Sequence, residues 1–161
     1  NKLFSLQFRS IYTSKDIQAN RSLIRIRSVE GWWHELHILL NRNAASIIDF
    51  AIIRGDNKGK LEQDSYSSNT IGFAFNGKIF INKVGRIQTK LEWTNISTDP
   101  RNTYLPPEAL NGYTLGKGIR TDTRLQYYLN RTLSLNISIN TIHNSLYKKL
   151  ITLQGEIRAH F

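Results

Sequence analysis

Hydrophobic and polar residues alternate along most of the chain, most regularly towards its C-terminal end. Between residues 151 and 161, every odd position is apolar or small and every even position is polar. Successive side chains of a β-strand point to opposite faces, so this period predicts strands with one apolar face. Five strands are predicted clearly, at 71–81, 86–93, 119–129, 132–140 and 151–161, and weaker ones at 3–13, 22–29, 32–41 and 45–53. No helical period of useful length is present.

The connections between these strands alternate between short and long. The segments 41–44, 82–85 and 130–131 are tight, whereas 55–69, 97–117 and 143–149 are longer, polar connections. Connections that alternate between short and long are typical of an antiparallel up-and-down sheet. If Leu125 and Ile137 share the apolar face, the connection at 130–131 must contain an odd number of residues, about three.

Three features favour a membrane as the environment of the apolar face. The predicted strands are longer than the usual strands of soluble sheets. Large aromatic residues such as Trp32, Trp33 and Trp93 lie near strand ends, as in the interfacial girdles of membrane barrels. The polar faces carry opposite charges, as the interior of a barrel does. The sequence therefore predicts an all-β protein, an antiparallel up-and-down transmembrane β-barrel that forms a single domain over 1–161.

The number of strands depends on how residues 22–41 fold. Counted separately, the segments number about nine, whereas bacterial single-chain barrels have even strand numbers. If 22–41 is one strand with a kink at Glu30 and Gly31, the barrel has about eight strands. Otherwise, the chain supplies the C-terminal strands of a larger barrel. The alternation of apolar and polar residues also permits an alternative, a soluble lipocalin-like barrel whose apolar face lies in a core.

Composition excludes several other classes. The chain has 161 residues, of which 40% are hydrophobic, and its longest apolar runs are too short for a spanning helix. It contains no cysteine, so disulfides and thiolate metal sites are excluded. The net charge of +10 suggests a nucleic-acid partner. The basic residues stand singly between apolar neighbours, however, and we therefore expect no nucleic-acid binding.

Two parts of the chain resemble a known group of proteins. The final strand has apolar residues at alternate positions and ends in an aromatic residue; it resembles the assembly signal of bacterial outer-membrane barrels, at Leu153, Gly155, Ile157, Ala159 and Phe161. Residues 106–112 and 127–135, together with this end, are similar to the C-terminal ends of large outer-membrane proteins of the Bacteroidetes. The resemblance covers roughly the last third of the chain. It implies a location in the bacterial outer membrane, recognition by the outer-membrane assembly machinery and a chain that is the C-terminal piece of something longer.

Candidate site residues follow from the charges and the outer connections. We expect an ion-pair network in the barrel interior, formed by Glu92, Arg120, Asp122, Arg124, Glu156 and Arg158. Tyr147, Lys148 and Lys149 are candidate contacts to the phosphates of lipopolysaccharide, since they lie in a predicted outer connection.

No catalytic or metal site is predicted. His34 and His37 are three residues apart, which places them on opposite faces of a strand and prevents them from sharing a metal ion. His143 precedes Asn144 and Ser145, a set similar to that of outer-membrane phospholipases, but neighbouring residues rarely reach a triad geometry. We expect no cofactor and no enzyme activity, with an outer-membrane lipid hydrolase or acyltransferase as a remote alternative.

The expected function is therefore that of an outer-membrane β-barrel. We expect a structural or interaction subunit of an envelope transport or secretion assembly, in contact with membrane lipids, lipopolysaccharide and other envelope proteins. The excess of arginine on the polar faces makes an anion-favouring pore the first alternative. A soluble lipocalin-like binding barrel is the second.

Overall fold

The computed structural model describes residues 4–17, 27–43, 46–61, 64–81, 84–101, 105–145 and 149–159. They form one antiparallel sheet of eight strands, in which each strand pairs with its neighbours in the sequence. The strands are β1 (Phe4–Ile17), β2 (Arg27–Asn43), β3 (Ser46–Leu61), β4 (Asp64–Ile81), β5 (Gly85–Asp99), β6 (Gly116–Tyr128), β7 (Leu133–Asn144) and β8 (Leu150–Ala159). The prediction of an all-β, up-and-down antiparallel fold is confirmed.

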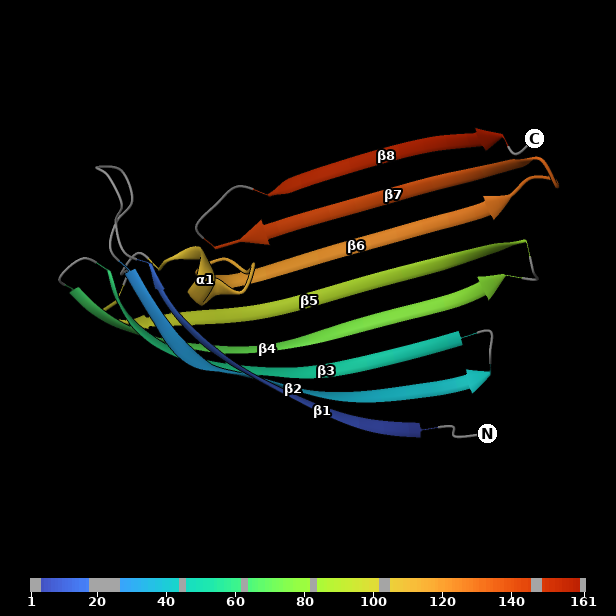
Figure 1. Cartoon of the computed structure of the whole chain (residues 1–161). Coiled ribbons are helices and arrows are strands. Elements are labelled where there is room, and N and C mark those ends of the chain that lie inside the picture. Colours follow the sequence, from blue (N-terminus) through green and yellow to red (C-terminus); the bar gives the residue numbers. More distant parts are fainter. Residues whose placement is uncertain are drawn as a thin grey trace.

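The sheet is open, with β1 at one edge and β8 at the other (Figure 1). The two chain ends lie at the same end of the sheet, where β2 joins β3, β4 joins β5 and β6 joins β7 (Figure 1). We call this the proximal end. The opposite, distal end carries the helix α1 (Pro107–Leu110), a single turn between β5 and β6 (Figure 1). No helix in the described part of the chain has the length and apolar composition needed to cross a membrane.

The described part of 22–41, residues 27–41, belongs to a single strand, so the described residues contain eight strands. β2 runs from Arg27 to Asn43, and its pairing with β3 passes Gly31 without a shift in register. Gly31 is needed for this close pairing, because a Cβ atom there would collide with the Asn57 side chain and with the Asp56 carbonyl oxygen. The glycine of the predicted kink is therefore a site of close strand approach, and the pairing of β2 with β3 continues through it.

The prediction of a long polar connection at 55–69 is wrong. β3 and β4 continue through this stretch and pair from Gly55 with Thr70 out to Leu61 with Asp64. Polar residues of the stretch, among them Asn57 and Ser68, are buried. They are covered by a segment that follows β5. The hydrophobic pattern of β3 and β4 does not reveal this cover, because the covering residues lie elsewhere in the sequence.

The connection between β6 and β7 has the predicted parity and length. Leu125 pairs with Ile137, and the last pair of the ladder is Tyr128 with Ser134. Beyond that pair, the Leu129 amide donates to the Leu133 carbonyl oxygen at 3.0 Å, which leaves the three residues 130–132 in the turn. The Asn130 side chain organises this turn. Its Oδ1 atom accepts hydrogen bonds from the backbone nitrogens of Thr132 at 2.9 Å and Leu133 at 2.7 Å. An asparagine that satisfies nearby backbone donors is a common turn device.

The two faces of the sheet differ sharply. The register places large apolar side chains opposite one another across the sheet, as in the row Phe8, Leu36, Ile52 and Phe73. We call the face that carries this row the apolar face. Its side chains are open to the surroundings on all eight strands; Leu6 is 61% exposed, Ile52 58% and Leu153 69%. The other, polar face carries most of the charged side chains of the strands.

Candidate functional site

The segment 105–115, which connects β5 to β6, folds back onto the polar face at the distal end. Leu105 and Ala109 are buried against Val29, Tyr66 and Ile96, which come from β2, β4 and β5. Ala109 is fully buried. This small cluster is the apolar core of the described residues, and it holds the segment against the sheet. We call residues 105–115 the inner segment.

Local sequence explains why the inner segment contains a helical turn. Pro107 begins α1, where the missing amide of proline costs no hydrogen bond. Asn111 and Gly112 follow α1 with φ angles of 48° and 80°, the left-handed conformation that ends helices and that these two residue types adopt most readily. The predicted polar connection at 97–117 did not include this helix, because four residues are too few to show a period.

Polar contacts attach the inner segment to several strands. Asn57 of β3 donates a hydrogen bond from Nδ2 to the Ala109 carbonyl oxygen at 3.1 Å. Arg27 of β2 donates to Glu108 Oε1 at 2.8 Å. Asn144 of β7 donates to Thr114 Oγ1 at 2.6 Å and to the Leu115 carbonyl oxygen at 2.9 Å. Because these anchors come from strands far apart in the sequence, the segment braces the sheet across its width.

Tyr113 reaches further along the polar face. Its ring stacks on Trp33 with the centroids 5.7 Å apart, and its hydroxyl donates to Glu92 Oε1 at 3.1 Å. The same carboxylate oxygen forms an ion pair with Lys90 Nζ at 2.8 Å. Arg120 donates to the Gly112 carbonyl oxygen at 3.0 Å, beside the same tyrosine. Tyr113 thus joins the inner segment to the charged rows of β5 and β6.

The protonation of Tyr113 gives a first prediction. Burial, and then the negative charge of Glu92, raises the pKa of the Tyr113 phenol above its usual value. A raised pKa in the folded protein stabilises the fold below the ordinary tyrosine value of about 10, and this stability is lost as the pH rises through the raised pKa. We therefore expect the inner segment to stay attached at pH 10 and to detach only at a more alkaline pH.

The measurement is an absorbance titration of tyrosinate, with Tyr113→Phe as the comparison. The variant should lack one late-titrating phenol while keeping the stack on Trp33. A wild-type titration in which every phenol ionises near pH 10 would contradict the buried hydrogen bond to Glu92.

The charged residues predicted to form one network lie on the same face, in separate local pairs. Arg124 makes two hydrogen bonds to Asp122, both at 2.9 Å, and Arg158 pairs with Glu156 at 2.8 Å. Glu92 is paired with Lys90, as described above. These pairs join residues two apart on one strand, an arrangement that alternation along a strand permits directly.

A second polar cluster, around His37, was not predicted. His37 Nδ1 lies 3.1 Å from Asp49 Oδ1, and its Nε2 lies 3.2 Å from Glu35 Oε2. Glu35 also accepts a hydrogen bond from Trp33 Nε1 at 2.9 Å. The sequence signal was Asp49, a lone carboxylate within an apolar run. Within the residues that the structure describes, no group of three or more histidine, cysteine or acidic residues is arranged to hold a metal ion.

The remaining candidate residues are placed as follows. Leu153, Gly155, Ile157 and Ala159 lie on the exposed apolar face of β8, and Lys149 is exposed just before that strand. Phe161, Tyr147 and Lys148 lie outside the described residues. His34 faces the apolar side, where it stacks on Trp32 and on Phe8, whereas His37 faces the polar side, so the two do indeed point apart.

Comparison with protein-family models, with curated proteins and with solved structures finds no match for this chain. The function is therefore inferred from the two faces of the sheet and from the inner segment.

Proposed function

We propose that this chain forms part of the wall of a bacterial outer-membrane β-barrel, with its apolar face towards lipid and its polar face towards the interior. In this role it is a structural or interaction subunit of an envelope transport or secretion assembly. One observation carries the proposal: large apolar side chains are exposed on the same face of all eight strands. Soluble monomers rarely expose contiguous apolar patches of more than a few hundred Å².

The strand lengths support the same placement. The strands contain 10 to 18 residues, and a tilted strand needs about 9–11 to cross a bilayer. Strands as long as β4 would then extend beyond the lipid at the distal end. There the apolar face gives way to polar residues such as Asp56 and Asn69. The proximal turns would face the periplasm, in keeping with the short periplasmic turns of such barrels.

The position of the inner segment supports a barrel of more than eight strands. Unpaired backbone groups are not tolerated in lipid, so the free edges of β1 and β8 require partner strands in a membrane. A barrel of eight strands has an interior just wide enough for side chains. Here the polar face also accommodates α1 and its flanking residues. Closure through further strands provides that room, whereas direct pairing of β1 with β8 does not.

The two alternatives fit less well. A soluble lipocalin-like barrel would enclose its apolar face, but the covering segment lies on the polar face. An anion-favouring pore draws support from a hollow of about 330 Å³ on the polar face, lined by Arg86, Arg124 and Arg158 together with Glu156. Steady conductance of the purified protein in a planar bilayer would favour this pore, and its absence would favour a packed interior.

The proposal is tested by expressing the chain with an export signal, joined to the strands that complete the barrel, and following its extraction. We expect the protein to remain in the outer-membrane fraction after washing with alkaline carbonate and to need detergent for release. Because closed strand ladders keep their hydrogen bonds in detergent, unboiled and boiled samples should migrate differently on a denaturing gel. Release into buffer without detergent, with the same migration in both samples, would overturn the membrane proposal.

A further inference from the structure

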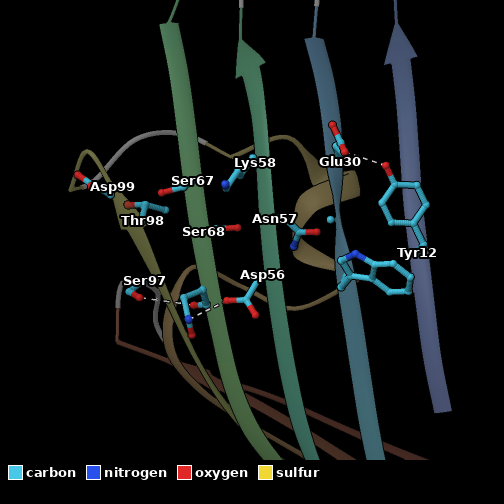
Figure 2. Close-up of a pocket in the computed structure, with 13 residues that line it drawn as sticks. Tyr12, Glu30, Asp56, Asn57, Lys58, Ser67, Ser68, Ser97, Thr98 and Asp99 are labelled. Carbon is cyan, nitrogen blue, oxygen red and sulfur yellow. Dashed lines mark hydrogen bonds between the residues drawn. The ribbon is translucent and has the colours of Figure 1, made fainter.

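A groove lies at the distal end of the sheet, on the face opposite to α1, just beyond the last apolar side chains (Figure 2). Its volume is about 670 Å³, within the range of roughly 300–1,000 Å³ that is usual for small-ligand sites. Residues of β1 to β5 line it, and most of them point to the same side of the sheet. We call it the distal groove.

One wall of the distal groove is aromatic. Tyr12 of β1 and Trp32 of β2 pack against each other with their ring centroids 5.0 Å apart. Even so, each remains about half exposed, at 48% and 49%. The Tyr12 hydroxyl donates to Glu30 Oε1 at 2.8 Å, which fixes the orientation of the phenol ring. The groove thus has a fixed apolar platform with a free surface.

The other side of the groove is polar and held in place by hydrogen bonds. Asn69 donates from Nδ2 to Asp56 Oδ1 at 2.9 Å, and Ser97 Oγ donates to the Asn69 carbonyl oxygen at 3.5 Å (Figure 2). The Asp56 side chain is nevertheless 51% exposed. Carboxylate and amide groups of this kind have further donor and acceptor positions available for a ligand.

We propose that the distal groove binds a neutral oligosaccharide. A sugar ring has an apolar C–H face and a rim of hydroxyl groups that both donate and accept hydrogen bonds. The Tyr12 and Trp32 platform suits the apolar face, because burying it removes apolar surface from water. Asp56 and Asn69 suit the hydroxyl rim.

The charge of the groove decides between neutral and anionic ligands. Its lining contains the carboxylates of Glu30, Asp56 and Asp99 against the ammonium group of Lys58. Arg54, which is not part of the lining, forms an ion pair with Asp56 at 3.5 Å, so one negative charge remains in excess. Phosphate and sugar-acid groups are recognised by arginine and lysine, which are in the minority here. A phosphorylated or acidic sugar therefore meets net repulsion in this groove, whereas an uncharged one does not.

This inference does not rest on membrane insertion, because binding can be measured on folded protein in either case. The experiment uses the whole chain in an amine-oxide detergent, since maltoside and glucoside detergents would compete as sugars. Isothermal titration with neutral oligosaccharides of glucose, galactose, mannose and xylose, four to six units long, should show saturable binding to at least one. Phosphorylated or uronic-acid oligosaccharides should bind at least about tenfold more weakly, since they lack a cationic partner.

Variants test whether binding takes place in the distal groove. Trp32→Ala should weaken binding by about tenfold, and Asp56→Ala by a similar factor, because each removes one side of the groove. Trp93→Ala is the matched control. Trp93 also stacks on a ring of the apolar face, that of Phe73, but does not line the groove. It should leave binding unchanged.

Three outcomes would overturn the proposal: no binding of any neutral oligosaccharide at millimolar concentration, preferred binding of the anionic forms, or binding that Trp32→Ala leaves intact while the variant stays folded by circular dichroism. Binding only to vesicles that contain a glycolipid, and not to the free sugar, would also overturn it, since the groove would then recognise the lipid surface.

Discussion

Arginine in place of Ile137 is expected to reduce the amount of folded protein in the membrane sharply, whereas arginine in place of the adjacent Asn136 is tolerated. Ile137 lies on the apolar face of β7, opposite Leu125 and Gly155. Near the middle of a bilayer, an arginine directed at lipid costs about 2–4 kcal/mol. Asn136 points to the polar face, where it lines the hollow that also contains Glu156. A new guanidinium group there enters a polar hollow and not lipid, although it adds to the positive charge of Arg86, Arg124 and Arg158.

The measurement is the urea midpoint of the barrel that contains this chain, refolded into lipid vesicles, combined with its abundance in the outer-membrane fraction. The two variants place the same arginine at one of two consecutive residues, so the total charge and the position along the strand are matched. Equal loss of stability at both positions would mean that the apolar face does not contact lipid.

Aspartate in place of Ala109 is expected to release the inner segment from the polar face. Ala109 is fully buried against Val29, Tyr66 and Ile96, and it has no room or partner for a carboxylate. Burying an unpaired charge costs about 3 kcal/mol or more, so the segment should detach. The strand pairs do not depend on this cluster, and the sheet itself should persist.

Hydrogen exchange measures the release. The backbone amides of Ala109 and Tyr113 donate to the Pro106 and Leu110 carbonyl oxygens at 3.0 and 2.9 Å, and these amides should exchange rapidly in the variant. Asn111→Asp is the control, because it places the same side chain on the same segment at an exposed position. If Ala109→Asp kept wild-type protection, the inner segment would not be held by its apolar cluster.

Much of the sheet was predictable because each strand exposes one face to a uniform environment. Most of β6, β7 and β8 alternates regularly, and Leu125 and Ile137 share the apolar face, as the predicted turn parity required. The distal half of β3 and β4 was missed for a physical reason. There the polar face is covered by the inner segment, so Asn57 and Ser68 are buried although both are polar. In this part of β3 and β4, a polar residue is therefore not a sign of a solvent-exposed position.

The site itself was less predictable. The inner segment contains one helical turn, and its contacts join residues far apart in the chain. Arg27 and Glu108, for example, are separated by 81 positions. The distal groove likewise combines residues of β1 to β5, and neither side of it forms a motif along the chain. Only the register of the sheet brings them together.

The two-residue connection between β3 and β4 limits how this chain can change in length. Across that connection an even-numbered residue pairs with an odd-numbered one, as Ile52 does with Phe73. Adding or deleting a single residue at 62–63 would exchange the faces of all later strands relative to β3, or force a bulge. The longer connection between β5 and β6 can absorb a change of one residue. After β3, insertions and deletions, including epitope tags and fused domains, should therefore be tolerated only when they change the length by an even number of residues. After β5, both odd and even changes should be tolerated.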